Sequence, residues 1–255
     1  MQVMEAVKDQ KPWFGFEQEY LLQTLEGLPF GWANSEPPPT GVSGHVGLDK
    51  VFGRDVCMSH FNACLYAGIK FAGVTGEAIP AQWEFQVGPC EGLELGDHAW
   101  MARYILHRVC EDFGVIVLFH PKPIKHPRWC NGGHMNFSTE SMRAEGGIKH
   151  IHAAIERLAQ RHAEHMEVYG SDENRERLNN VGLNSDFYTF SWATAKRKCS
   201  VRIPGLVSQA GRGYLEDRRP AADCDPYLVC KALVQTCLLP PSVETLEEQM
   251  SENTV

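Results

Sequence analysis

Apolar and polar side chains alternate with a period of two in residues 13–22. This period, in a segment rich in aromatic residues, predicts a β-strand with one buried face. Glu17 and Glu19 lie together on one face of this strand, whereas Phe16 and Tyr20 lie on the other. Each residue of a strand rises by about 3.3 Å, so the two carboxylates lie about 6 to 7 Å apart, which suits ligands of one or two divalent cations. A solvated strand face is the alternative, unless further acidic side chains converge on this face.

The remaining periodicity predicts several shorter strands separated by helices. Strands are predicted in two runs of 71–88 and over 115–119, 134–139 and 199–204. Helices are predicted over 54–68, 98–113, 147–169 and 226–239. Helices and strands follow one another irregularly, and no βαβ phosphate-binding fingerprint occurs, so the order of elements predicts an α+β fold.

Local signals add detail to these elements. Asp97 is the predicted N-cap of the helix over 98–113, which has Trp100 and Tyr104 on its apolar face, and Asp225 is the predicted N-cap of the last helix. The polar, asparagine-containing stretch 171–185 predicts a loop.

Two histidines lie three residues apart on the helix predicted over 147–169. His162 and His165 have the wrong spacing for a zincin, which needs histidines four residues apart with a glutamate after the first. We interpret both as surface histidines.

Composition limits the classes of function. The chain has 255 residues, is 43% hydrophobic and 22% charged, and carries a net charge of −8, with its 24 lysines and arginines scattered along the sequence. A nucleic acid partner is therefore not expected. No run of 18 apolar residues and no secretory signal is found, so we expect no membrane partner and a cytoplasmic protein. The nine cysteines include no C-x-x-C pair, which indicates reduced core thiols.

Acidic residues on strands are the strongest chemical signal. The chain has no P-loop and no G-x-G-x-x-G turn. Five glutamates and one histidine lie on predicted strands or beside glycines: Glu17, Glu19, Glu77, Glu84, Glu216 and His134. Together with Arg197, Arg202 and Arg218, they indicate Mg²⁺ or Mn²⁺ sites next to a phosphoryl-transfer clamp, where metals and guanidinium groups neutralise phosphate charge.

Several long motifs resemble one family in their order and spacing. They are P-W-F-G-F-E-Q-E-Y, P-A-Q-W-E-F-Q-V-G-P-C-E-G, L-H-R-V-C-E-D-F-G-V-I, H-M-N-F-S-T, V-R-I-P and L-E-D-R-R-P-A-A-D-C-D-P. The chain thus resembles the catalytic domain of eukaryotic-type glutamine synthetase. The resemblance implies a large, mostly antiparallel sheet flanked by helices over 1–241, and we expect the acidic tail 242–255 to be disordered.

The resemblance also implies a reaction, ATP-dependent ligation of glutamate and ammonia through γ-glutamyl phosphate. The family's metal ligands fall on Glu17, Glu77 and Glu84 for one Mg²⁺ or Mn²⁺ ion. They fall on Glu19, His134 and Glu216 for the other. Its catalytic arginines fall on Arg197, Arg202 and Arg218. Its ATP-binding residues fall on Trp13, Arg197, Arg202 and Tyr214, and its glutamate-binding residues on Asn131, Gly132, Arg177 and Arg218.

The sequence departs from the family pattern on the substrate side. The Asn-Gly pair of the glutamate loop lies closer to the histidine, in W-C-N-G-G-H, and Gly182-Leu183 replace the flap's His-Glu pair. A leucine cannot accept a proton. A Tyr-Cys-Gly-rich segment is replaced around 43–45. The family's N-terminal β-rich domain, which completes the neighbouring subunit's active site, has no counterpart, since the chain starts at the helix before the catalytic domain.

Three functions therefore remain open. The first is glutamine synthesis by a homo-oligomer or by an assembly with a full-length family member. The second is a structural or regulatory role for a catalytically inactive relative that still binds nucleotide and metal. The third is a ligase of the same family acting on another amine or carboxylate.

Overall fold

The computed structural model describes residues 2–32, 46–47, 51–125, 129–179 and 186–240. Within them, one eight-stranded sheet has the order β2-β3-β1-β5-β8-β7-β6, and β4 also pairs with β1. All neighbours are antiparallel except β6 and β7, which confirms the α+β class and the mostly antiparallel sheet. The strands are β1 (Trp13–Gln23), β2 (Phe71–Gly76), β3 (Gln82–Glu91), β4 (Ile116–Leu118), β5 (Gly133–Ser138), β6 (Trp192–Thr194), β7 (Val201–Ile203) and β8 (Leu215–Asp217). The predicted tail 242–255 lies outside the described residues.

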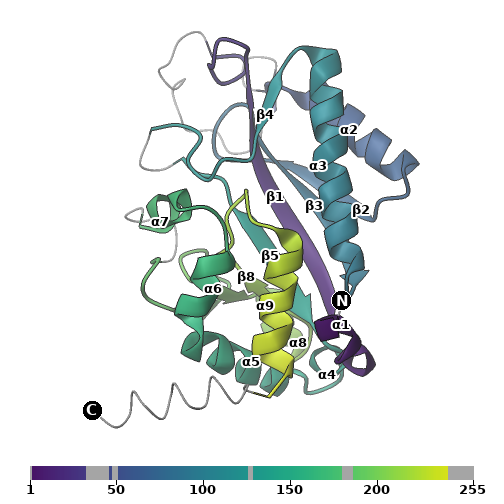
Figure 1. Ribbon diagram of the computed structural model, residues 1–255, viewed down its shortest axis with the longest axis vertical. Helices are drawn as coiled ribbons and strands as arrows, with labels where there is room; N and C mark the ends of the chain where they lie inside the picture. The colour runs from purple at the N-terminus through teal and green to yellow at the C-terminus, as the bar shows by residue number, and fades with distance from the viewer. Residues whose placement is uncertain (1, 33–45, 48–50, 126–128, 180–185, 241–255) are drawn as a thin grey trace.

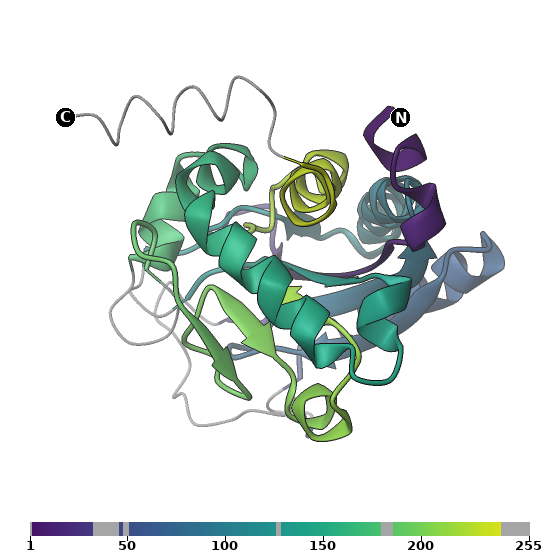
Figure 2. The same ribbon diagram turned by 90° about the horizontal axis from the view of Figure 1, so that it is seen from below.

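Helices pack against one face of this sheet. Figure 2 shows α3 and α9 next to each other on that face, where α3 contacts β1 and β3 and α9 packs on α3 and α5. The helices are α1 (Gln2–Glu5), α2 (Arg54–Tyr66), α3 (Glu94–Phe113), α4 (Glu140–Arg143), α5 (Ile148–Gln160), α6 (His162–Val168), α7 (Glu173–Leu178), α8 (Gly205–Ala210) and α9 (Pro226–Leu238), with a short 3₁₀ turn at Lys8–Gln10. No helix among the described residues is long and apolar enough to cross a membrane.

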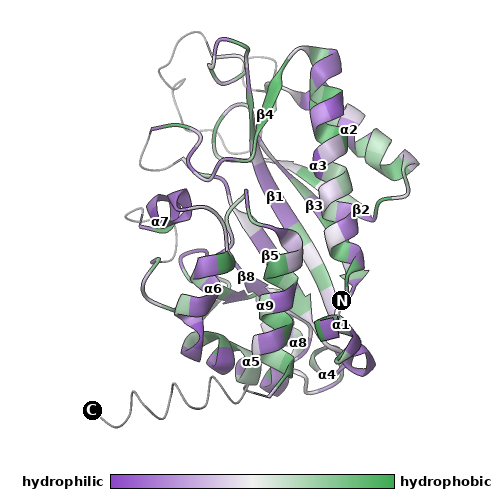
Figure 3. Cartoon of the chain, in the orientation of Figure 1, coloured by the Kyte–Doolittle hydropathy of each residue, from purple (hydrophilic) through white to green (hydrophobic). Residues whose placement is uncertain are grey.

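Strand β1 lies inside the sheet, between β3 and β5 (Figure 1), and its side chains point alternately to the two faces. Phe16 and Tyr20 are fully buried, whereas Glu17 and Glu19 are only partly buried. Figure 3 shows hydrophilic and hydrophobic residues mixed along this strand. The alternation predicted in residues 13–22 is therefore confirmed as far as Tyr20, whereas Leu21 and Leu22 are both buried.

The helix predicted over 98–113 begins earlier than its sequence signal suggests. It starts at Glu94, so Asp97 is not its N-cap but lies in the first turn, where it accepts a hydrogen bond of 2.5 Å from the hydroxyl of Tyr227. Trp100 and Tyr104 are 46% and 60% exposed, because the side of the helix that faces the sheet is built from other residues. Those buried residues are Leu95, Ala99, Ala102, Arg103, Leu106 and Cys110.

Two predictions near residue 170 are wrong. The stretch predicted as a loop over 171–185 contains α7 (Glu173–Leu178), and residues 180–185 lie outside the described part of the chain. His162 and His165 are not on the surface but are 8% and 2% exposed, because α6 packs against α9. The helical pattern over 147–169 is divided at Arg161 into α5 and α6.

Replacing Asp225 with alanine tests the predicted start of α9. Its carboxylate accepts a 2.9 Å hydrogen bond from the backbone N–H of Tyr227, so Asp225→Ala should lower the free energy of unfolding by about 1 kcal/mol in urea titrations. Asp172→Ala is the matched control, because Asp172 precedes α7 without any side-chain cap bond. Equal losses in the two variants would contradict the cap assignment.

Candidate active site

The register of three strands gathers the predicted ligands on one face. Glu19 on β1 lies directly opposite Glu84 on β3, and Glu17 lies directly opposite His134 on β5. Side chains directly opposite each other point to the same face with their Cβ atoms about 4.5 to 5.5 Å apart. Glu216 reaches this face from β8, the next strand beyond β5.

These residues form two groups that could each hold a metal ion. One ligand atom each of Glu19, Glu77 and Glu84 lies within 4.8 Å of the others, and the same holds for Glu17, Glu84 and His134. The Nδ1 atom of His134 lies 3.4 Å from Glu17 Oε2 and 3.7 Å from Glu216 Oε1. The structure therefore brings all six residues together. Compared with the sets implied by the resemblance, however, Glu17 and Glu19 exchange places.

The carboxylates of this cluster repel one another when no cation is bound. Burial, followed by the neighbouring carboxylate of Glu19, raises the pKa of Glu77 to about 8. Burial and the carboxylates of Glu17 and Glu19 raise the pKa of Glu84 to about 9. Burial, with the Arg218 guanidinium next, lowers the pKa of His134 to about 3, so that its imidazole is neutral and able to bind metal. Carboxylate oxygens with one imidazole fit Mg²⁺ or Mn²⁺.

Two arginines flank the acidic cluster. Arg202 Nε and Arg218 Nη1 both donate hydrogen bonds to the fully buried carboxylate of Glu216, the second at 2.5 Å. Arg218 Nε also donates to the backbone carbonyl of Arg197, at 3.1 Å, while the Arg197 side chain itself is exposed. Two guanidinium groups therefore lie beside the carboxylates on the β8 side of the cluster.

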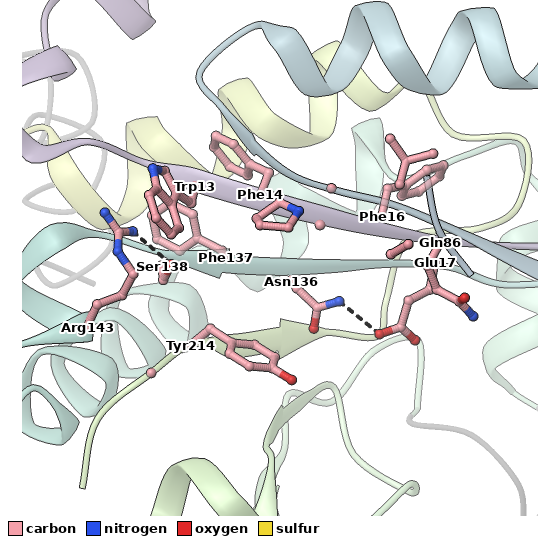
Figure 4. Close-up of a pocket in the computed structure, with 16 residues that line it drawn as sticks. Trp13, Phe14, Phe16, Glu17, Gln86, Asn136, Phe137, Ser138, Arg143 and Tyr214 are labelled. Atoms are coloured by element: carbon pink, nitrogen blue, oxygen red, sulfur yellow. Dashed lines mark hydrogen bonds between the residues drawn. The ribbon is translucent and has the colours of Figure 1, made fainter. Parts of the chain in front are cut away.

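A cavity of about 420 Å³ adjoins the cluster at Glu17. Trp13 and Tyr214, to which the resemblance assigns ATP binding, line it. Figure 4 shows Asn136 in the same cavity, where its side-chain amide donates a hydrogen bond of 2.8 Å to Glu17. Arg143 is a residue that the sequence analysis missed. Its guanidinium lies 3.9 Å from the centroid of the Trp13 ring and donates to Ser138 Oγ, yet no motif singles it out, since it belongs to the short α4.

The residues predicted to bind glutamate are all buried. The side chain of Asn131 is fully buried and supports the loop. Its Oδ1 accepts a hydrogen bond of 2.9 Å from Gln82 Nε2, and its Nδ2 donates to the backbone carbonyl of His120 at 3.1 Å. The backbone N–H of Gly132 donates to Glu19 at 2.6 Å. Arg177 is buried and donates to the backbone carbonyl of Pro220 at 3.0 Å. The substituted positions 182–183 and 43–45 lie outside the described residues.

The stability of the metal-free protein should fall as the pH rises from 6.5 to 8. Glu77 and Glu84 have pKa values of about 8 and about 9 when folded and ordinary values near 4.5 when unfolded, so between these values the folded state binds more protons. The pKa of His134 is lowered instead, so this group adds stability as the pH rises towards its ordinary pKa of 6.5 and little further above it. Urea titrations should show a loss on the order of 1 to 2 kcal/mol per pH unit.

Saturating Mn²⁺ should remove this slope, because a cation replaces the protons, and Glu84→Gln should reduce it without metal. A metal-free wild-type protein whose stability is constant across this range would contradict the electrostatic account.

Comparisons with known proteins show the family of the chain. A family profile described as the catalytic domain of glutamine synthetase matches residues 6–148. Glutamine synthetases of Xenopus laevis and Homo sapiens are 56% and 52% identical over 243 residues, which is 93% of this chain. The chain spans 62% and 65% of the length of these relatives. A Plasmodium falciparum glutamine synthetase structure shares the fold, with a TM-score of 0.74 at 15% identity over 92% of this chain and 53% of that one. The chain belongs to the glutamine synthetase family.

Proposed function

We propose that the chain carries the catalytic residues for ATP-dependent ligation of glutamate and ammonia through γ-glutamyl phosphate. One observation supports this most strongly: two potential metal-binding groups share Glu84 and lie beside the guanidinium groups that bond Glu216. Glu19, Glu77 and Glu84 would hold one Mg²⁺ or Mn²⁺ ion, and Glu17, His134 and Glu216 the other. Such ions, when bound, neutralise phosphate oxygens during transfer.

ATP would bind with its base in the cavity that Trp13 and Tyr214 line. Aromatic faces give a purine a stacking surface, and the cavity opens at Glu17, which places the phosphates next to the metal ligands. Arg197, Arg202 and Arg218 would neutralise the charge that develops on the transferring phosphoryl group. The last two are already ordered by Glu216, so little reorganisation is required of them.

Glutamate would bind on the other side of the cluster, near Gly132, Asn131, Arg177 and Arg218. At Gly132 a Cβ atom would lie 2.7 Å from His134 Nε2 and 3.1 Å from Arg177 Nη1. Only glycine therefore lets the backbone approach these two side chains. We further propose that the chain works in a homo-oligomer or with a full-length family member, because the family's active site is completed by a neighbouring subunit.

Mn²⁺ with ATP should stabilise the purified chain against heat. A ligand that binds only the folded state at about 100 times its Kd adds about 2.7 kcal/mol, which differential scanning fluorimetry readily detects. The double variant Glu17→Ala with Glu19→Ala should lose this stabilisation. The control pair Glu111→Ala with Glu164→Ala removes two exposed carboxylates away from the cluster and should retain it. An unchanged shift in the first double variant would refute the metal assignment.

Activity is a separate question, because Leu183 replaces the flap glutamate and favours a second candidate, an inactive relative that binds nucleotide and metal. Losing one well-placed general base costs ~10² to 10⁴-fold in rate. The γ-glutamyl hydroxamate assay should therefore give low but measurable turnover that Leu183→Glu raises. No turnover in either protein assayed by itself, with metal and ATP bound, would favour the inactive relative and exclude a ligase that works without a full-length partner.

A further inference from the structure

The face of β8 opposite the candidate site carries a buried polar network. Along this segment side chains alternate: Glu216 and Arg218 face the acidic cluster, whereas Asp217 and Arg219 face the helices. Both of the latter are fully buried. Two charged residues in the core, adjacent in sequence to two residues of the site, need an explanation beyond packing, because a buried ion pair contributes little net stability.

Asp217 is fully bonded on this side. Arg219 binds it through Nε at 2.9 Å and Nη2 at 2.6 Å, and the hydroxyl of Tyr169 donates to it at 2.8 Å. The guanidinium of Arg219 also lies between the rings of Tyr169 and Phe190, at 5.1 Å and 5.3 Å from their centroids. The Asp217 carboxylate is therefore held by hydrogen bonds from Arg219 and Tyr169, and all three side chains are buried.

Two histidines extend the network at its ends. His165 Nδ1 lies 2.5 Å from the Tyr169 hydroxyl and its Nε2 lies 2.7 Å from the Thr236 hydroxyl on α9. His162 Nδ1 lies 3.0 Å from Arg219 Nη1, and its Nε2 lies 3.0 Å from the carbonyl of Phe187. The network thus joins α6, α9, β8 and the segment that contains Phe187.

With both imidazole rings neutral, only one placement of the protons satisfies every bond. Tyr169 gives its single proton to Asp217, so it must accept from His165, which then carries its proton on Nδ1 and accepts from Thr236 at Nε2. Arg219 can only donate, so His162 accepts at Nδ1 and carries its proton on Nε2, towards Phe187. Burial lowers the pKa of His165 to about 3, which agrees with a neutral ring.

We propose that this network of Asp217, Arg219, Tyr169 and the two histidines positions Glu216 and Arg218 for metal and phosphate binding. Among the described residues, no side chain of the network bonds a predicted metal ligand. Its one direct link to the site is the backbone carbonyl of Arg219, which accepts a hydrogen bond of 2.5 Å from Arg177. The network holds Asp217 and Arg219 on the helix-covered face and thereby fixes the backbone of this segment. The Glu216 carboxylate is then placed near His134, and the Arg218 guanidinium is placed near Glu216. Partners behind a metal ligand typically change metal affinity 10 to 100-fold when they are removed. This inference rests on the proposed metal function.

The test measures the Kd of the full chain for Mn²⁺. The concentration of free Mn²⁺ is determined from its electron paramagnetic resonance signal. Tyr169→Phe keeps the ring against Arg219 but removes the hydroxyl, and it should raise the Kd about 10-fold. Tyr20→Phe is the matched control, since that hydroxyl is equally buried but, among the described residues, bonds only the thiol of Cys57, at 3.1 Å. It should bind Mn²⁺ within about twofold of wild type, although it also loses a buried hydrogen bond.

Each outcome decides between two hypotheses. Wild-type protein that binds no Mn²⁺ would refute the proposed function and this inference with it. Wild-type binding with an unchanged Kd in Tyr169→Phe, despite a lower Tm, would refute the positioning role alone.

A measurement on the wild-type protein keeps the inference testable if Tyr169→Phe does not fold. Nitrogen-15 NMR of the imidazole rings should show neutral rings of opposite tautomers at pH 6, with the proton on Nδ1 of His165 and on Nε2 of His162. The same tautomer in both rings, or a protonated ring, would overturn the network.

Discussion

The register of β1 between β3 and β5 is the constraint on which the candidate site depends. Because side chains on a strand alternate with a period of two, a slip of one residue would turn Glu17 and Glu19 into the core. The helix-covered face prevents this. Gln18 is fully buried there and accepts a 2.8 Å hydrogen bond from Arg103, which also bonds the carbonyls of Ala222 and Cys224 at 2.9 Å. A polar group with such specific partners fits only one register.

The price of this arrangement is electrostatic. Burying neighbouring carboxylates favours their protonated forms, so the pKa values of Glu77 and Glu84 are raised by burial first and by the neighbouring carboxylates next. A divalent cation offsets both effects at once, because it supplies opposite charge and replaces the lost hydration. Local conflict of this kind is concentrated at functional sites in proteins that are otherwise consistently built. The arginines on Glu216 reduce the conflict only on the β8 side of the cluster.

Much of the fold could be predicted from local sequence signals. The alternation in β1, the N-cap of α9 and the α+β class all follow from short patterns. Predictions failed where burial depends on distant segments. Trp100 and Tyr104 suggest an apolar helix face, but small residues such as Ala99 and Ala102 lie against the sheet and leave the aromatic rings exposed. His162 and His165 gave no sign of burial, because their partners Arg219 and Thr236 lie far away in sequence.

The site was predictable in its members but not in its grouping. Strand alternation placed Glu17 and Glu19 on one face, yet the partner of each depends on the register with β3 and β5, which no local pattern contains. The most direct test is the number of Mn²⁺ ions bound per chain. The account predicts two ions in the wild type, loss of one in Glu19→Gln, which belongs with Glu77 and Glu84, and loss of the other in Glu17→Gln, which belongs with His134. A wild-type chain that binds a single ion, or variants that both lose the same ion, would contradict it.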